Sequence, residues 1–234
     1  MSAHEHRHPQ PFGPERASHY DAGVGAAIAG YAAMHEVIAA AMAAALRGNA
    51  AASVLCVGVG TGQELLPYAR YGAPAWRLTG VDTSPHMLAV ARERSSGAGL
   101  QGRVQLHAGA LQELPPGPRF DGAQMVGVLH HVEGEDARLA LLREVVRRLG
   151  PGAPFIIGGR VGADPVLLAV EEEQLRVAGV SPEQLERRRE GLAHAAPPPS
   201  DEALFALLHR AGLTEPRQLF ASLQFKVFRL RSAH

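Results

Sequence analysis

The sequence of 234 residues lacks the features that mark several classes of protein. Cys56 is its single cysteine, so no disulfide can form within the chain, and this favours a reducing compartment. No apolar run approaches the roughly 18 residues of a transmembrane helix, and the polar, histidine-rich first residues contain no apolar signal-peptide core. We therefore expect a soluble, cytoplasmic protein with no membrane partner.

An excess of charge of one sign is also missing, because 23 basic residues balance 23 acidic ones. The chain has neither an aromatic-rich basic stripe nor an Asn/Asp-Pro-Pro-Tyr motif, so we expect no nucleic-acid partner. Histidine, cysteine and aspartate residues with the spacing of metal ligands are absent, as is a Gly-x-Ser-x-Gly turn. The sequence thus offers no candidate metal site and no serine nucleophile in such a turn.

Hydrophobic residues make up 46% of the chain, enough for one core domain with an insertion or cap. His4, His6 and His8 alternate in the first residues, where they could bind a metal weakly, but the composition favours a disordered tail. The expected divisions are this tail (1–15), an N-terminal helical lid (16–49), a ligand-binding core (50–160), a helical cap insertion (161–199) and a closing helix with two strands (200–234).

The most informative stretch runs from a short apolar strand, Val54–Val57, into a glycine turn at Gly58, Gly60 and Gly62. A helical pattern follows from about Gln63. A strand, a glycine turn and a helix N-terminus together are typical of a nucleotide-binding corner, although a tight turn alone can use glycine for purely structural reasons. Gln63 stands where a dinucleotide fingerprint requires its third glycine, which argues against a pyrophosphate cofactor.

A second strand, Trp76–Asp82, ends in an acid that lies 20 residues beyond Gly62. At that distance, an acid at the end of the second strand reaches a ribose hydroxyl. Asp82 alone could equally be a cap or turn residue, but the preceding glycine turn favours the ribose. Thr83 and Ser84 then predict the start of a helix over residues 85–94.

Strands and helices continue to alternate along the chain. The predicted elements are strands at 103–107, 120–129 and 154–157, helices at 18–29, 31–47, 135–149, 166–177, 182–194 and 200–210, and closing strands at 215–221 and 223–231. This alternation predicts an α/β fold with a doubly wound, mostly parallel sheet. Right-handed crossovers place the carboxyl ends of the parallel strands along one edge, where we expect the site.

In this order the segments resemble the class I S-adenosylmethionine (SAM)-dependent methyltransferases. The resemblance covers residues 50–160, through Val-Leu-Cys-Val-Gly-Val-Gly-Thr-Gly, Gly-Val-Asp-Thr-Ser-Pro-His-Met-Leu, Val-Leu-His-His-Val and Arg-Arg-Leu-Gly-Pro-Gly. It implies a Rossmann-like, seven-stranded sheet with an antiparallel closing strand. It also implies SAM as the cofactor, with S-adenosylhomocysteine (SAH) as the product.

The resemblance assigns roles to individual residues. It places the three glycines of the turn beneath the methionine part of SAM, Asp82 at the ribose hydroxyls and Met87 against adenine. The remaining expected cofactor contacts are Tyr20, Thr83, Ala110, Leu111 and Val128. One departure is that Gly109-Ala110 stands where many relatives carry Gly-Asp, so a backbone N–H of Ala110 or Leu111 is expected to read the adenine edge.

Because SAM carries a good leaving group, the protein mainly has to align the acceptor with the methyl carbon, by direct in-line displacement. His130 and His131, just beyond the fourth strand, are candidate general bases with near-neutral pKa, or else pack at the strand end. Apolar residues over 165–195 predict a small, largely apolar acceptor, or contacts with the sheet or with a second subunit in a homodimer. The charged run 186–190 is interpreted as a solvated helix face rather than as an anion site.

The leading hypothesis is therefore a small-molecule methyltransferase. One alternative is an enzyme like the carboxy-SAM synthases of tRNA modification, whose entry segment residues 20–31 vaguely resemble. Arg160, Arg176 and Arg187 are then candidates to hold the extra carboxylate. A second alternative is a non-catalytic module that binds SAM or SAH.

Overall fold

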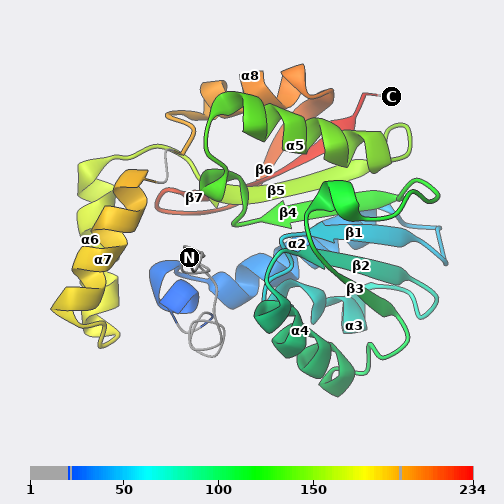
Figure 1. The fold of residues 1–234 in the computed structure, drawn as a ribbon, viewed down its shortest axis with the longest axis horizontal. Helices are drawn as coiled ribbons and strands as arrows, with labels where there is room; N and C mark the ends of the chain where they lie inside the picture. The colour runs from blue at the N-terminus through cyan, green and yellow to red at the C-terminus, as the bar shows by residue number, and fades with distance from the viewer. Residues whose placement is uncertain (1–20, 22, 195–196, 234) are drawn as a thin grey trace, which may run out of the picture.

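A computed structural model describes residues 21, 23–194 and 197–233 of the chain (Figure 1). Its centre is a seven-stranded sheet in the order β3-β2-β1-β4-β5-β7-β6. The strands are β1 (Ser53–Val57), β2 (Arg77–Asp82), β3 (Val104–Ala108), β4 (Gly122–Val126), β5 (Pro154–Arg160), β6 (Leu213–Ser222) and β7 (Phe225–Ser232). β1 to β5 pair in parallel, whereas β7 is antiparallel to both β5 and β6. The predicted doubly wound sheet with an antiparallel closing strand is confirmed.

Helices cover both faces of the sheet (Figure 1). They are α2 (Tyr31–Ala45), α3 (Tyr68–Tyr71), α4 (Pro85–Gly97), α5 (Glu135–Arg148), α6 (Pro165–Val177), α7 (Pro182–His194) and α8 (Asp201–Arg210). α5 and α8 lie against one face, α2, α3 and α4 against the other, and α6 and α7 stand beside the sheet (Figure 1). No helix in the described part of the chain is long and apolar enough to cross a membrane.

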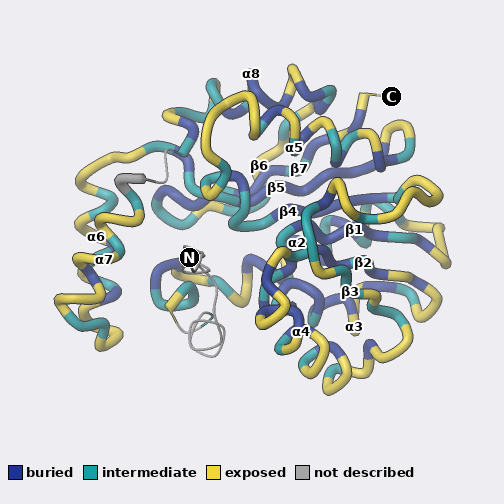
Figure 2. Tube along the Cα trace, in the orientation of Figure 1, coloured by how far each residue is buried: buried dark blue, intermediate teal, exposed yellow. Residues whose placement is uncertain are grey.

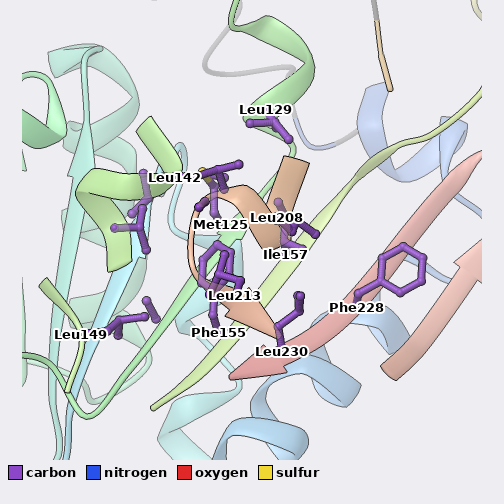
Figure 3. Close-up of a cluster of buried hydrophobic side chains, with 14 of the residues drawn as sticks. Met125, Leu129, Leu142, Leu149, Phe155, Ile157, Leu208, Leu213, Phe228 and Leu230 are labelled. Atoms are coloured by element: carbon purple, nitrogen blue, oxygen red, sulfur yellow. The ribbon is translucent and has the colours of Figure 1, made fainter. Parts of the chain in front are cut away.

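The sheet separates two apolar cores, and Figure 2 shows its buried strands between partly exposed helices. Successive side chains of a strand point to opposite faces, so Leu55 belongs to the core beneath α5 and α8, and Cys56 to the other. Figure 3 shows the first core, in which Met125, Leu142 and Phe155 are fully buried. Because both of its faces are covered, the central strand β1 reads as a continuous apolar run, whereas the outer strands β2 and β3 carry polar residues and are only partly buried.

Local sequence signals fix where several helices begin. Ser84 is the N-cap of α4, where its hydroxyl accepts a hydrogen bond from the Met87 N–H at 3.3 Å, and Pro85 follows in the first turn. Ser200 caps α8 in the same way, with the Ala203 N–H at 3.2 Å. These caps confirm the helix starts that the sequence predicts at both places.

Two elements around the predicted site differ from expectation. The helix expected from Gln63 is a 3₁₀ turn (Gln63–Leu65), separated from the short α3 by Pro67. Proline has no N–H for the helical ladder, and its ring disfavours helical geometry in the preceding residue. β4 ends at Val126 rather than at the expected 129, because Gly127 turns the chain at φ 75°. The predicted tail (1–15) and residues 18–20 and 22 of the first predicted helix lie outside the described residues, whereas residues 21 and 23–27 are helical, as predicted.

Candidate cofactor and active site

The glycine turn lies between β1 and the 3₁₀ turn, and its three glycines all have positive φ, 69° at Gly58, 51° at Gly60 and 77° at Gly62. A Cβ on Gly58 would lie 2.2 Å from Cγ2 of Val128, and one on Gly62 would lie 2.9 Å from Ala91. A Cβ on Gly60 would meet nothing closer than the Gly58 oxygen at 3.9 Å. Gly58 and Gly62 therefore make room for other parts of the protein, and Gly60 is the one of the three whose added Cβ no described residue would crowd.

Asp82 joins the glycine turn to the start of α4. Its Oδ2 accepts a hydrogen bond from the Gly60 N–H at 2.8 Å, and its Oδ1 accepts one from the Ser84 N–H at 2.8 Å. Each carboxylate oxygen can accept a further bond. Thr83 beside it is exposed and Met87 is buried. The acid thus lies against the turn, as its position in the sequence predicts.

At the end of β3, Glu113 supplies a carboxylate that the sequence analysis missed. Its Oε2 accepts a hydrogen bond from the Ala110 N–H at 2.8 Å. A Cβ on Gly109 would lie 2.3 Å from the same oxygen, and the φ of 145° at this residue disfavours any side chain, so glycine suits this position. The Ala110 N–H, expected to read adenine, is therefore engaged within the protein, and Leu111 beside it is buried. An acid three residues after the N-cap of a helical turn, here Glu113 after Ala110, was the available signal.

The N-terminal segment reaches the glycine turn through Asp21, which the sequence analysis did not single out as a site residue. The Thr61 hydroxyl donates to Asp21 Oδ1 at 2.8 Å and to Oδ2 at 3.0 Å. Arg94 of α4 forms an ion pair with the same carboxylate. Asp21 thus ties the segment expected to form a lid to both sides of the turn. Tyr20, an expected cofactor contact, lies outside the described residues.

Two buried titratable side chains lie near the turn. Burial raises the pKa of Glu64 to about 8, an interaction with Gln124 opposes this, and the charge of Asp82 adds to it. Burial lowers the pKa of His35 to about 4 against the opposing charge of Asp21, and neither of its ring nitrogens has a hydrogen-bond partner among the described residues. A hollow of about 240 Å³ beside them is lined by Ala32, His35, Glu36, Gln63, Leu66, Pro67 and Arg70.

His130 and His131 lie in a 3₁₀ turn, Leu129–His131, just beyond β4. Burial is the main cause that lowers the pKa of His130 to about 3, and the positive charges of His131, Arg160, Arg138 and Arg188 add to it. The expected near-neutral pKa is therefore wrong for His130, which is uncharged at neutral pH and weakly basic. His131 is exposed, and the two ring centroids lie 4.2 Å apart.

The α6–α7 pair only partly matches the expected apolar cap. Leu175 is 2% exposed, but Val166 and Val177 are 69% and 77% exposed. The expectation that residues 186–190 form only a solvated face is wrong at one position, because Arg188 pairs with the buried Glu171. Across residues 21, 23–194 and 197–233, no group of three His, Cys, Asp or Glu side chains is arranged to hold a metal ion.

Comparison with known proteins places this geometry in context. Residues 54–152 match a family model described as a methyltransferase domain. A ubiquinone/menaquinone biosynthesis C-methyltransferase from Geobacter sulfurreducens is 29% identical over 113 residues, covering 48% of this chain and 43% of that protein. A tRNA U34 carboxymethyltransferase from Shewanella sp. (strain W3-18-1) is 35% identical over 98 residues, covering 42% of this chain and 29% of that protein.

The crystal structure of magnesium protoporphyrin IX methyltransferase from Synechocystis PCC 6803 with bound SAH aligns with a TM-score of 0.61 at 17% identity. The alignment covers 86% of this chain and 83% of that one. The chain spans less than half the length of the curated relatives it matches. The strand order and the glycine turn with its acid partner agree with the matched model, and residues 54–152 of the chain carry a methyltransferase domain.

Proposed function

We propose that the protein transfers the methyl group of SAM to a small-molecule acceptor by direct in-line displacement. The observation that carries this proposal is the Gly60 corner: a glycine that no described residue crowds, whose N–H donates a hydrogen bond to the acid that ends β2. It lies between β1 and β4, where the order of the parallel strands reverses. Ligands of open α/β sheets bind at such a switch point.

The residues at this corner fit SAM. Gly60 leaves room for backbone contact with the methionine part, and Asp82 keeps acceptor capacity for ribose hydroxyls. Gly58, Gly62 and Val128 shape the turn by close packing rather than by clearing space. The other proposed contacts are Tyr20, Thr83, Met87, Ala110 and Leu111, to which Glu113 is added as an acceptor for the adenine amino group.

Bound SAM supplies an electrophilic methyl group on a sulfonium, which is itself the leaving group. The protein's task is then to orient the acceptor, and orientation alone can contribute about 7–11 kcal/mol in favourable cases. Asp21 holds the N-terminal segment against the turn, which would exclude water from the site. His130 and His131 are the proposed acid–base residues, with His130 as an uncharged hydrogen-bond acceptor for the nucleophile's proton.

A small-molecule acceptor is supported by composition and by relatives. Balanced charge offers no broad attraction to nucleic acid. Two similar proteins are named for magnesium protoporphyrin IX and for ubiquinone/menaquinone biosynthesis, which concern small molecules. We accordingly propose an acceptor that enters between the N-terminal segment and α6–α7.

Calorimetry and label transfer test the proposed function together. Titration of SAM and of SAH should give saturable binding to the wild-type chain. Incubation with methyl-labelled SAM and a metabolite extract should label a small molecule, identified by mass spectrometry. Absence of binding by either nucleotide would overturn the proposal, and binding without label transfer would leave the non-catalytic module as the function.

A carboxy-SAM-dependent activity is the second candidate. It is favoured by the similarity to a carboxymethyltransferase and by Arg160, which is buried at the end of β5. The two other candidate arginines are less suited, because Arg176 pairs with the exposed Glu173 and Arg187 is exposed. Mass spectrometry of the nucleotide that co-purifies with the protein separates the two cofactors by the mass of one carboxylate.

We also propose a cytoplasmic homodimer that forms through α6. Val166, Val170 and Val177 are exposed apolar side chains on this helix. Positions four and eleven residues along a helix share one face, so these valines form a stripe. Light scattering after size-exclusion chromatography should give twice the chain mass, and Val170→Glu should give monomers; a monomeric wild type would refute the dimer.

A further inference from the structure

The hairpin of β6 and β7 forms one edge of the sheet and carries three arginines on one face (Figure 1). Side chains of a strand alternate between the two faces, and Val227 of β7 belongs to the core on the α2 face. Arg229 and Arg231 follow it by two and four residues, so they point to that face. Arg217 of β6 lies directly opposite Arg229 in the register of the hairpin and shares this face. The three residues form the arginine row of the hairpin.

A bulge in β6 places Arg217 in this row. Thr214 lies opposite Arg231. The next pair is Arg217 with Arg229, so three steps along β6 match two steps along β7. Without the extra residue, Thr214 and Arg217 would point to opposite faces of the sheet. Glu215 at the bulge has a φ of 55°, which residues other than glycine rarely adopt, so strained backbone turns Arg217 toward Arg229.

The bulge creates an unfavourable pair of like charges, because such charges directly opposite each other destabilise a sheet. Neither Arg217 nor Arg229 has an ion-pair or hydrogen-bond partner among the described residues. The partner of Arg231 is weak, since Oε2 of Glu215 lies 3.7 Å from its Nε and both side chains are exposed. Arg217 and Arg231 are open to solvent and Arg229 is half-buried. An anion can therefore reach the row, and it would offset the repulsion within it.

The arginine row lies away from the site proposed for SAM. Arg231 is opposite Pro154 and Arg229 is opposite Ile156, at the start of β5. The Gly60 corner lies beyond the carboxyl ends of β1 and β2. Parallel strands begin at one edge of the sheet and end at the other, so the row and the corner are at different edges. An anion on the row leaves the proposed cofactor site free.

We propose that Arg217, Arg229 and Arg231 bind the phosphate group of a soluble phosphomonoester, at a site separate from methyl transfer. Guanidinium groups bind phosphate oxygens through paired hydrogen bonds, and a phosphate dianion has three terminal oxygens to share among them. Directly opposite residues of adjacent strands have Cβ atoms about 4.5–5.5 Å apart, so two long arginine side chains reach one phosphate. The strained bulge and the like-charge pair then serve the bound state, as strain at a functional site does.

A small ligand fits the row better than a nucleic acid or a membrane does. The row spans two neighbouring pairs of the hairpin, whereas a nucleic acid presents a chain of phosphates to a longer basic stripe. A membrane-binding surface also inserts apolar side chains among the lipids. The large apolar side chains that are exposed in the described part of the chain are Val37, Tyr71 and three valines of α6, and none lies on the hairpin.

Calorimetry with inorganic phosphate as the probe, at constant ionic strength, tests the site. Phosphate should bind the wild type saturably and Arg217→Gln about tenfold or more weakly, as expected for lost hydrogen bonds to a charged group. The control is Arg143→Gln at an exposed arginine of α5, against the other face of the sheet, which should bind phosphate like the wild type. No saturable binding would overturn the proposal, and so would equal affinity in the wild type and Arg217→Gln.

Thermal melts give a second readout at the same position. Without phosphate, Arg217→Gln should melt at or above the temperature of the wild type, because the substitution removes the repulsion from Arg229. Saturating phosphate should raise the melting temperature of the wild type more than that of the variant, since a ligand that binds the folded state stabilises it. If the variant melts below the wild type without phosphate and gains as much from phosphate, Arg217 supports the fold and the proposal is wrong.

The source of the phosphate is tested with further probes. Phenyl phosphate should compete with inorganic phosphate for the wild type. Binding of phosphatidic acid vesicles or of a single-stranded oligonucleotide, without binding of phenyl phosphate, would overturn the assignment to a small molecule. SAH is titrated into the same samples and should bind the wild type and Arg217→Gln equally; weaker SAH binding in the variant would overturn the separation of the two sites. Phosphate binding by a wild type that binds no SAH would refute the methyl transfer and leave the anion site.

Discussion

The N–H of Gly60 donates a hydrogen bond to Oδ2 of Asp82 at 2.8 Å. This bond links the end of β1 to the end of β2 at the point where we propose that SAM binds. Asp82 therefore has two tasks, because it positions Gly60, the glycine of this turn that no described residue crowds, and offers its remaining lone pairs to a ribose. A substitution at Asp82 should affect cofactor affinity by both routes.

Replacing Asp82 by Asn should weaken SAH binding by roughly tenfold to a hundredfold, the range expected for loss of hydrogen bonds to a charged group. The amide also points a donor at the Gly60 or Ser84 N–H, which disturbs the turn. Calorimetry measures the dissociation constant. The matched control is Asp136→Asn on the exposed start of α5, which should bind SAH like the wild type. Unchanged affinity in the Asp82 variant would contradict the proposed ribose contact.

Gly58→Ala should destabilise the fold by about 1–3 kcal/mol, from strained backbone and overpacking against Val128. Gly99→Ala is the matched control, because Gly99 has a φ of 73° but nothing within 4 Å of an added Cβ. The control should lose only the stability that backbone strain at positive φ removes, about 1–2 kcal/mol. Urea denaturation measures both. Adding Val128→Ala to Gly58→Ala should restore the stability that overpacking removes. The contact would be refuted if the double variant lost as much free energy of unfolding as the two single variants together.

Asp21→Ala should speed SAH dissociation and weaken its affinity by about twofold to tenfold, as expected for loss of one or two exposed or half-buried hydrogen bonds. The substitution removes the bonds to Thr61 and Arg94 that tie the N-terminal segment to the turn. Stopped-flow fluorescence with a competing nucleotide measures dissociation. Glu36→Ala, which breaks the exposed ion pair with Arg70, serves as the control. Equal dissociation rates in all three proteins would rule out a lid role for Asp21.

Glu64→Gln should make the protein more stable than wild type as pH rises. The folded-state pKa is about 8 against an ordinary 4.5, so the folded state holds its proton more tightly than the unfolded state does. As pH rises from about 4.5 to about 8, this group therefore lowers the free energy of unfolding of the wild type, by at most about 1.4 kcal/mol per pH unit. In thermal melts, the difference in melting temperature between the variant and the wild type should be small below pH 5, widen toward pH 8 and then level off. A gap independent of pH would contradict the raised pKa.

His130→Ala should lower turnover by about a hundredfold or more while leaving SAH affinity unchanged, as expected for loss of a general base. His131→Ala, at the exposed neighbour, should have a smaller effect. Because the pKa of His130 is lowered to about 3, its ring signals in NMR spectra of the free protein should not titrate between pH 5 and 8. Unchanged turnover would remove His130 from the mechanism.

Much of the fold could be predicted because its signals are local. Apolar runs such as Val54–Val57 read as buried strands, and Ser84 before Pro85 marks a helix start, with no knowledge of distant residues. The short reach of these signals also explains the errors. Gly127 and Pro67 shorten the elements next to them. The pattern of apolar residues does not predict where either element ends.

The site was harder to predict because its contacts join distant parts of the chain. Arg188 reads as one of a charged run, yet on a helix adjacent residues point about 100° apart. Arg188 can therefore pair with the buried Glu171 while Arg189 forms an exposed ion pair with Glu172. Asp21 meets Arg94 only because the N-terminal segment folds back onto α4. Such pairings depend on how elements pack, and residue spacing does not encode them.

The fit of Val128 against Gly58 has a consequence for the evolution of this corner. The Cγ2 atom of Val128 takes the space of the missing methyl group, so neither position can enlarge alone. Ala91 and Gly62 are matched in the same way across α4. In homologous chains the two positions of each pair should therefore covary, with a side chain gained on one side accompanied by a smaller residue on the other.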